Sequence, residues 1–149
     1  MKNYLINENT LAILPEGESG SLVIEKDNSY LVSKRPNTII KCNCAMHGSS
    51  FQGRLDGTKE LTGYIYKAPI VIEDKTNMIA FPTTSPRLEK VAWVLLNHVD
   101  YAYEDSGKNE NMIMFNNGLS VKIDSSLNIL NNQILRATRL SSKLKKNNA

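Results

Sequence analysis

Residues 112–123 read MIMFNNGLSVKI and contain the clearest hairpin signal in the sequence. Two short apolar or β-branched runs, 112–115 and 119–123, flank the tripeptide Asn116-Asn117-Gly118. Asn and Gly tolerate the positive φ angles that a tight turn between antiparallel strands requires. The stretch therefore predicts a β-hairpin and, with it, an antiparallel sheet.

The residues before this hairpin continue the β pattern. Val91–Tyr103 is rich in Val, Tyr and Trp and predicts a longer strand, whose aromatic side chains fit core or cross-strand positions better than base stacking. Further upstream, the apolar runs Ile70–Ile72 and Met78–Phe81 are joined by a polar turn and bracketed by Pro69 and Pro82. This arrangement predicts a second hairpin.

The first half of the chain also has strand character, and we expect a meander or a small barrel there. Its short apolar or β-branched runs are Thr10–Leu14, Ser21–Glu25, Tyr30–Ser33 and Thr38–Cys44. Gly48-Ser49-Ser50 then supplies helix-capping residues, so we expect a short helix from about Ser50 to Leu61.

The last segment is typical of an amphipathic helix, with Asp124-Ser125-Ser126 as candidate caps. Apolar residues recur at helical spacing along one face: Leu127, Leu130, Ile134, Ala137 and Leu144. Basic residues repeat at steps of three and four, and we expect them on the opposite face: Arg136, Arg139, Lys143 and Lys146. The predicted fold class is α+β: an antiparallel β-rich domain with a short mid-chain helix and a C-terminal amphipathic basic helix.

Length and composition favour one globular domain over residues 1–149, since 41% of the residues are apolar and 22% are charged. The net charge is +3, but it is unevenly distributed. Residues 125–149 carry five cations and no acid, whereas the first 124 residues carry 13 cations and 15 acids. A basic C-terminal segment points to a polyanion such as nucleic acid. We expect a cytoplasmic protein, because no signal peptide or membrane span is evident.

The sequence gives little support for catalysis or a cofactor. Cys42, Cys44 and His47 form a weak metal-binding pattern, because structural zinc sites space their cysteines by two to four residues and add a second pair. We interpret them as reduced thiols on a strand, too constrained to form an intrachain disulfide, and a loop histidine. No nucleophile elbow, phosphate-binding glycine loop or zinc-protease motif is present. The chain is expected to hold no metal and not to be an enzyme.

The start of the mid-chain helix is a candidate phosphate site. The hydroxyls of Ser49 and Ser50 and the helix amides precede Arg54 by about one turn. Ordinary helix capping with a solvated arginine is the simpler alternative. Likewise, the basic stripe of the last helix is either a set of phosphate contacts or a solvated face whose cations suit the negative helix end.

Several short motifs occur in an order that resembles the ComK competence factors of Gram-positive bacteria. They span about Tyr4 to Lys143, and a series of matches in the same order is more specific than any one motif. The residues are Leu14-Pro15-Glu16, Ile24-Glu25-Lys26-Asp27, Gly48-Ser49-Ser50-Phe51, Gly53-Arg54, Gly57-Thr58, Lys67-Ala68-Pro69-Ile70, Phe81-Pro82-Thr83, Trp93, Phe115-Asn116-Asn117-Gly118, Asn132-Gln133 and Arg136.

The resemblance implies a transcription factor that activates genes for DNA uptake. It implies recognition of paired AT-rich boxes, largely through the minor groove, by dimers that pair on the DNA. No helix-turn-helix is evident, and narrow A-tract grooves attract inserted arginine and lysine, which agrees with this mode of binding. The resemblance assigns no base-contacting residues. Our electrostatic candidates for DNA contacts, with Ser49 and Ser50, are Arg54, Lys59, Lys67, Arg136, Arg139 and Lys143.

Two features depart from the family pattern. Family members continue with a further tail, implicated in activation and in recognition by the adaptor that delivers them to a Clp protease, whereas this chain stops at Lys146-Asn147-Asn148-Ala149. The order Pro86-Arg87 also differs from the usual arrangement in that loop. The alternative functions are a protein-interaction module that binds no DNA, a shortened paralogue that binds and titrates a full-length relative, and a metal-dependent enzyme.

Overall fold

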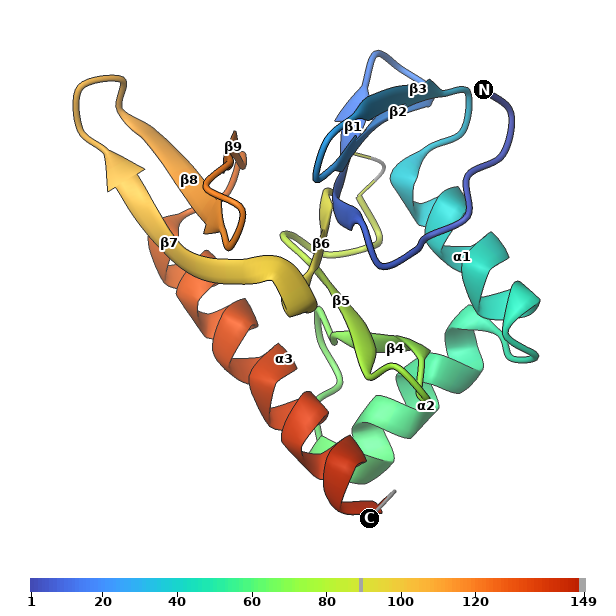
Figure 1. Ribbon diagram of the computed structural model, residues 1–149. Helices are drawn as coiled ribbons and strands as arrows, with labels where there is room; N and C mark the ends of the chain where they lie inside the picture. Colours follow the sequence, from blue (N-terminus) through green and yellow to red (C-terminus); the bar gives the residue numbers. More distant parts are fainter. Residues whose placement is uncertain (89, 148–149) are drawn as a thin grey trace.

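The computed structural model describes residues 1–88 and 90–147. Within these residues the chain forms a six-stranded sheet, a three-stranded sheet and three α-helices, as Figure 1 shows. The strand pairs of both sheets are antiparallel. Helices combined with antiparallel sheets confirm the predicted α+β class.

The large sheet has the strand order β3-β2-β1-β6-β5-β4. Its first three strands are the predicted meander, and β4 with β5 is the predicted second hairpin, so the first half does not form a small barrel. The strands are β1 Thr10–Glu16, β2 Gly20–Glu25, β3 Ser29–Val32, β4 Ile70–Glu73, β5 Met78–Pro82 and β6 Trp93–Leu95.

The small sheet contains the hairpin of residues 112–123, which is confirmed. Its strands, in spatial order, are β7 Val99–Asp105, β8 Glu110–Phe115 and β9 Ser120–Lys122. At the turn, the Phe115 amide donates to the Leu119 carbonyl at 2.9 Å. Gly118 has a φ of 88°, a left-handed conformation that glycine adopts without strain.

The helices are α1 Pro36–Met46, α2 Phe51–Thr62 and α3 Leu127–Asn147. The last two confirm the predicted helices. Ser50 caps α2, since its hydroxyl accepts from the Gly53 amide at 3.0 Å. Ser126 caps α3 in the same way, accepting from the Ile129 amide at 3.2 Å. Unpaired amides at both helix starts are thus partly satisfied by side chains.

The prediction of a strand at Thr38–Cys44 is wrong, because this segment lies within α1. The β-branched residues Thr38, Ile39 and Ile40 suggested a strand, but Pro36 is pre-set for the first helical turn. The buried side chains, Ile39, Ile40, Asn43 and Cys44, follow helical spacing. Cys42 is exposed and Cys44 is buried, so the two thiols lie on different sides of the helix, and both are free.

The prediction of one long strand over Val91–Tyr103 is also wrong. A 3-10 turn, η1 Leu96–His98, separates β6 in the large sheet from β7 in the small sheet. Asn97 stabilises the break, because its side-chain oxygen accepts from the Ile79 amide at 3.2 Å and its amide donates to the Asn77 carbonyl at 2.9 Å. The chain leaves one sheet here and begins the other.

The large sheet is buried on both faces. Successive residues of β6 alternate between two core clusters: Trp93 and Leu95 belong to one, and Val94 to the other. The first cluster includes α1, and the second includes α3 and the small sheet. In Figure 1, α1 and α2 accordingly lie on one side of the large sheet, and α3 with β7–β9 on the other. Within the described residues, no helix is both long and apolar enough to cross a membrane.

Candidate nucleic-acid interface

A buried glutamine on α3, Gln133, links two separate segments: the connection between α2 and β4, and the end of β5. Gln133 is 1% exposed, and its side-chain amide donates to the Lys67 carbonyl at 2.8 Å and to the Pro82 carbonyl at 2.7 Å. Lys67 belongs to the connection between α2 and β4, and Pro82 ends β5. The amide therefore satisfies two carbonyls from separate segments, each of which would be costly to bury without a partner.

Arg136, about one turn further along α3, also binds the connection between α2 and β4. Its guanidinium donates to the Tyr66 carbonyl at 2.6 Å, to the Lys67 carbonyl at 3.4 Å and to the Gln133 side-chain oxygen at 2.7 Å. It also lies over the Tyr64 ring, 4.5 Å from the centroid. Burial lowers the pKa of the Arg136 guanidinium, but arginine remains charged in proteins. Arg136 thus has a structural role, and a phosphate contact by it stays a prediction.

The remaining cations of the stripe lie along one flank of α3. Lys143 is half-buried and directly precedes the buried Leu144, just as Arg136 precedes the buried Ala137. Arg139, between them, is exposed. The exposed Arg139 and Lys146 agree with the predicted opposite face, whereas the half-buried Arg136 departs from it, because its guanidinium turns to the α2–β4 connection.

At the start of α2, the hydroxyls of Ser49 and Ser50 are engaged within the chain. Ser50 caps the helix, and the Ser49 hydroxyl donates to the Ser50 carbonyl at 3.4 Å. Arg54 is half-buried near Cys44 on α1. Burial raises the pKa of the Cys44 thiol, and the charge of Arg54 partly opposes that rise. Local capping accounts for this geometry, and a DNA contact by these three residues stays a prediction.

Lys59 and Lys67 lie at the other end of α2. Lys59 is exposed, and its carbonyl accepts from the Gly63 amide at 2.8 Å, which ends the helix in a left-handed cap. Lys67 is half-buried and has a φ of 48°, so the backbone turns sharply there. Arg54 and Lys59 are about 140° apart around α2. The structure thus groups Lys59 and Lys67 near the α2–β4 connection, with Arg54 on another side of the helix.

A groove runs beside this connection. Lys67 and Arg87 contribute its cations, and among the described residues no acidic side chain lines it. Its walls come from the α2–β4 connection, the loop after β5 and the first turns of α2 and α3. The lining residues from these segments include Phe51, Leu55, Ile65, Tyr66, Pro86 and Ile129. The sequence analysis noted Arg87 only as part of the unusual Pro86-Arg87 order, and it did not identify Ile65 or Tyr66. Their signal was three bulky residues directly after Gly63, at positions 64–66.

The whole chain, residues 1–149, matches the family described as ComK protein. The chain belongs to the ComK family. It is 32% identical over 146 residues to the competence transcription factor of Bacillus subtilis (strain 168), a match that covers 96% of this chain and 76% of that relative. No solved structure matches the chain. Asn148 and Ala149 lie outside the described residues.

Motif residues that carry the ComK resemblance, although far apart in the sequence, meet in the structure. Gln133 joins Lys67 to Pro82, as described above. Phe51 meets Trp93 edge to face, with ring centroids 6.0 Å apart. Trp93 is fully buried, which confirms its predicted core role. These ComK motifs thus hold α2, α3 and the large sheet together.

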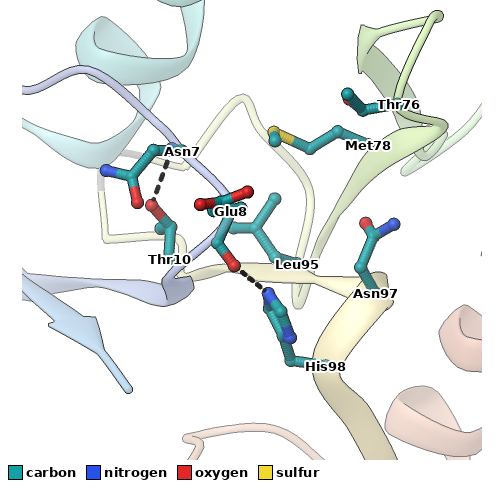
Figure 2. A pocket seen from close by; sticks show the side chains of 8 residues that line it. All are labelled: Asn7, Glu8, Thr10, Thr76, Met78, Leu95, Asn97 and His98. Atoms are coloured by element: carbon teal, nitrogen blue, oxygen red, sulfur yellow. Dashed lines mark hydrogen bonds between the residues drawn. The ribbon is translucent and has the colours of Figure 1, made fainter. Parts of the chain in front are cut away.

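A second hollow lies between the N-terminal segment and the junction of β6 and β7. It has a volume of about 210 Å³, which is below the roughly 300 to 1,000 Å³ of typical small-molecule sites. Figure 2 shows His98 reaching the Glu8 main chain, where its Nε2 donates to the carbonyl at 2.6 Å. Within residues 1–88 and 90–147, no three His, Cys, Asp or Glu residues are grouped to hold a metal.

We predict that His98 makes the ComK fold sensitive to mild acid. Burial lowers the pKa of His98, so the unfolded chain binds a proton at a higher pH than the folded chain does. The His98 contribution to stability is therefore complete above about pH 6.5 and is lost as the pH falls through the lowered pKa. Urea unfolding between pH 7.5 and 5.5 should show a shallower loss of stability for His98→Gln than for the wild type. Equal pH slopes would contradict this account.

We further predict that Arg136→Ala loosens the α2–β4 connection. Two backbone carbonyls lose a charged donor, so the free energy of unfolding should fall by about 1 to 3 kcal/mol. Amide exchange at residues 62–67 should accelerate more than exchange in β1 and β2. Arg139→Ala, at an exposed position on the same helix, is the control and should leave both measurements nearly unchanged. Unaltered exchange at residues 62–67 in Arg136→Ala would contradict the role given to this side chain.

Proposed function

We propose that this ComK family member is a transcription regulator of competence that binds DNA as one domain over residues 1–149. It recognises paired AT-rich boxes mainly through the minor groove, as dimers that pair on the DNA, and activates genes for DNA uptake. This function places it in the cytoplasm, with the chromosome, and assigns it no catalytic step, cofactor or metal. Family membership and the relative named competence transcription factor support the proposal.

One structural observation carries the assignment of a DNA-binding face. Lys59 lies in the last turn of α2 and Lys67 in the connection that follows, while Arg139 and Lys143 lie about one and two turns beyond Arg136 on α3; all four are exposed or half-buried. Gln133 and Arg136 fix this connection to α3, so the cations are presented on a rigid support. Phosphate contacts position a protein on DNA, and preorganised contacts lose less entropy on binding. We assign these four cations to the phosphates, and Arg136 both to the support beneath them and, as predicted, to a phosphate contact.

Ser49, Ser50 and Arg54 form a second, separate candidate contact at the start of α2. Arg54 is the candidate for insertion into the narrow groove, where arginine is favoured. Its Nε is buried without a hydrogen-bond partner in the chain. Adaptor-directed Clp proteolysis is a further element of the proposal that rests on the family resemblance alone.

The salt dependence of binding tests the phosphate assignment. Replacing Arg139 or Lys143 by alanine should weaken binding to AT-box and scrambled duplexes alike, and should reduce the slope of log affinity against log salt by roughly one per contact. Lys108→Ala, in the exposed turn between β7 and β8, is the matched control and should keep the wild-type slope. Fluorescence anisotropy at several salt concentrations measures both quantities.

Two results would count against the proposal. If Arg139→Ala and Lys143→Ala keep the wild-type slope, the stripe is a solvated face and these cations do not contact DNA. If the wild-type chain shows no preference for AT-box over scrambled duplex, the function is that of a protein-interaction module or of a paralogue that acts by titrating a relative.

A further inference from the structure

The connection between α2 and β4 exposes two adjacent large apolar side chains. Ile65 is 60% exposed and Tyr66 is 75% exposed. Leaving such side chains in water forgoes the stabilisation that their burial would give. Both residues line the groove that Lys67 and Arg87 border. An apolar pair beside cations, with no acid among the described groove residues, fits a ligand that is itself apolar inside and anionic outside.

The backbone under this pair is fixed at several points. The Tyr64 amide donates to the Thr62 hydroxyl at 3.2 Å, and the Tyr64 ring lies under the Arg136 guanidinium. The carbonyls of Tyr66 and Lys67 both accept from Arg136. Ile65 and Tyr66 are therefore held outward on a rigid turn, rather than on a loop that can fold back and bury them.

We propose that Ile65 and Tyr66 form a wedge that enters the DNA minor groove and partly unstacks one base step, while Lys67 and Arg87 contact the phosphates on either side. The proposal deepens the DNA-binding function given above and rests on it. Stacked bases offer an apolar interior between two rows of phosphates, which matches the apolar pair and its cationic border. Proteins that bind the minor groove frequently insert apolar side chains in this way, and TA steps unstack most easily.

The wedge accounts for two features that phosphate contacts alone leave unexplained. Simple phosphate binding needs cations, but it does not need two exposed apolar side chains on a braced turn. It also gives no preference for AT-rich sequence, whereas insertion favours steps that deform at low cost. The groove thus contributes sequence preference through DNA deformability, and the cations of α3 contribute affinity.

Fluorescence of 2-aminopurine tests the wedge directly. AT-box duplexes carry the probe in place of one adenine at successive positions, including TA steps, and unstacking raises its emission. Wild-type protein should raise the emission at one step, and Tyr66→Phe should do the same. The double variant Ile65→Ser with Tyr66→Ser should abolish the rise and weaken binding roughly tenfold, as expected when burial of a large apolar side chain is lost. Its salt slope should stay at the wild-type value.

Tyr101→Ser provides the matched control. Tyr101 is also an exposed aromatic residue, but it lies on β7 in the three-stranded sheet, away from the α2–β4 connection. It should behave as the wild type. Circular dichroism of each variant checks that it folds, which is expected because the replaced side chains are exposed.

The outcomes separate the two proposals. If wild-type protein prefers the AT-box but emission stays flat at every probe position, the wedge is wrong and the DNA-binding function stands. If the wild type shows no AT-box preference, the DNA-binding function itself fails. If the double variant keeps the emission rise, Ile65 and Tyr66 do not enter DNA. If the double variant instead loses self-association, the two side chains contact a second protein chain and do not enter DNA.

Discussion

The hydrogen bonds from Gln133 and Arg136 to the α2–β4 connection are the interaction on which the candidate interface depends. The Gln133 side chain is buried, and it binds carbonyls of Lys67 and Pro82 that come from different segments. Arg136 adds bonds to the Tyr66 and Lys67 carbonyls. A connection that would otherwise expose unpaired carbonyls is thereby fixed to α3. Because Tyr66 lies within it, the shape of the exposed surface follows from these hydrogen bonds.

The basic residues of α3 therefore fall into two groups with different roles. Arg136 is half-buried and lies over Tyr64 and against backbone carbonyls, so its charge mainly supports the fold. Arg139 is exposed and Lys143 is half-buried, so they remain available to an anionic partner. A periodic row of cations in a sequence is therefore not one functional unit. Which members contact a partner depends on what the neighbouring elements require of the others.

The sequence predicted the elements whose signals are local. Asn116-Asn117-Gly118 identified a hairpin because the turn needs positive φ angles, and Ser50 identified a helix start because its hydroxyl caps an amide. Thr38–Cys44 was misassigned because β-branched residues outweighed the helix-starting Pro36. The role of Arg136 and the exposure of Ile65 and Tyr66 depend on contacts across about 70 residues of sequence. Periodicity and spacing carry no information about such contacts.

Lysine labelling in the presence and absence of AT-box DNA tests most directly whether the surface braced by Gln133 and Arg136 is the one that binds DNA. Acetylation followed by mass spectrometry reports the accessibility of each lysine separately. DNA should protect Lys59, Lys67 and Lys143, and it should leave Lys108 in the β7–β8 turn as reactive as in the free protein. Protection of Lys108, with unchanged labelling of Lys59, Lys67 and Lys143, would place the DNA on the other side of the molecule and contradict the account.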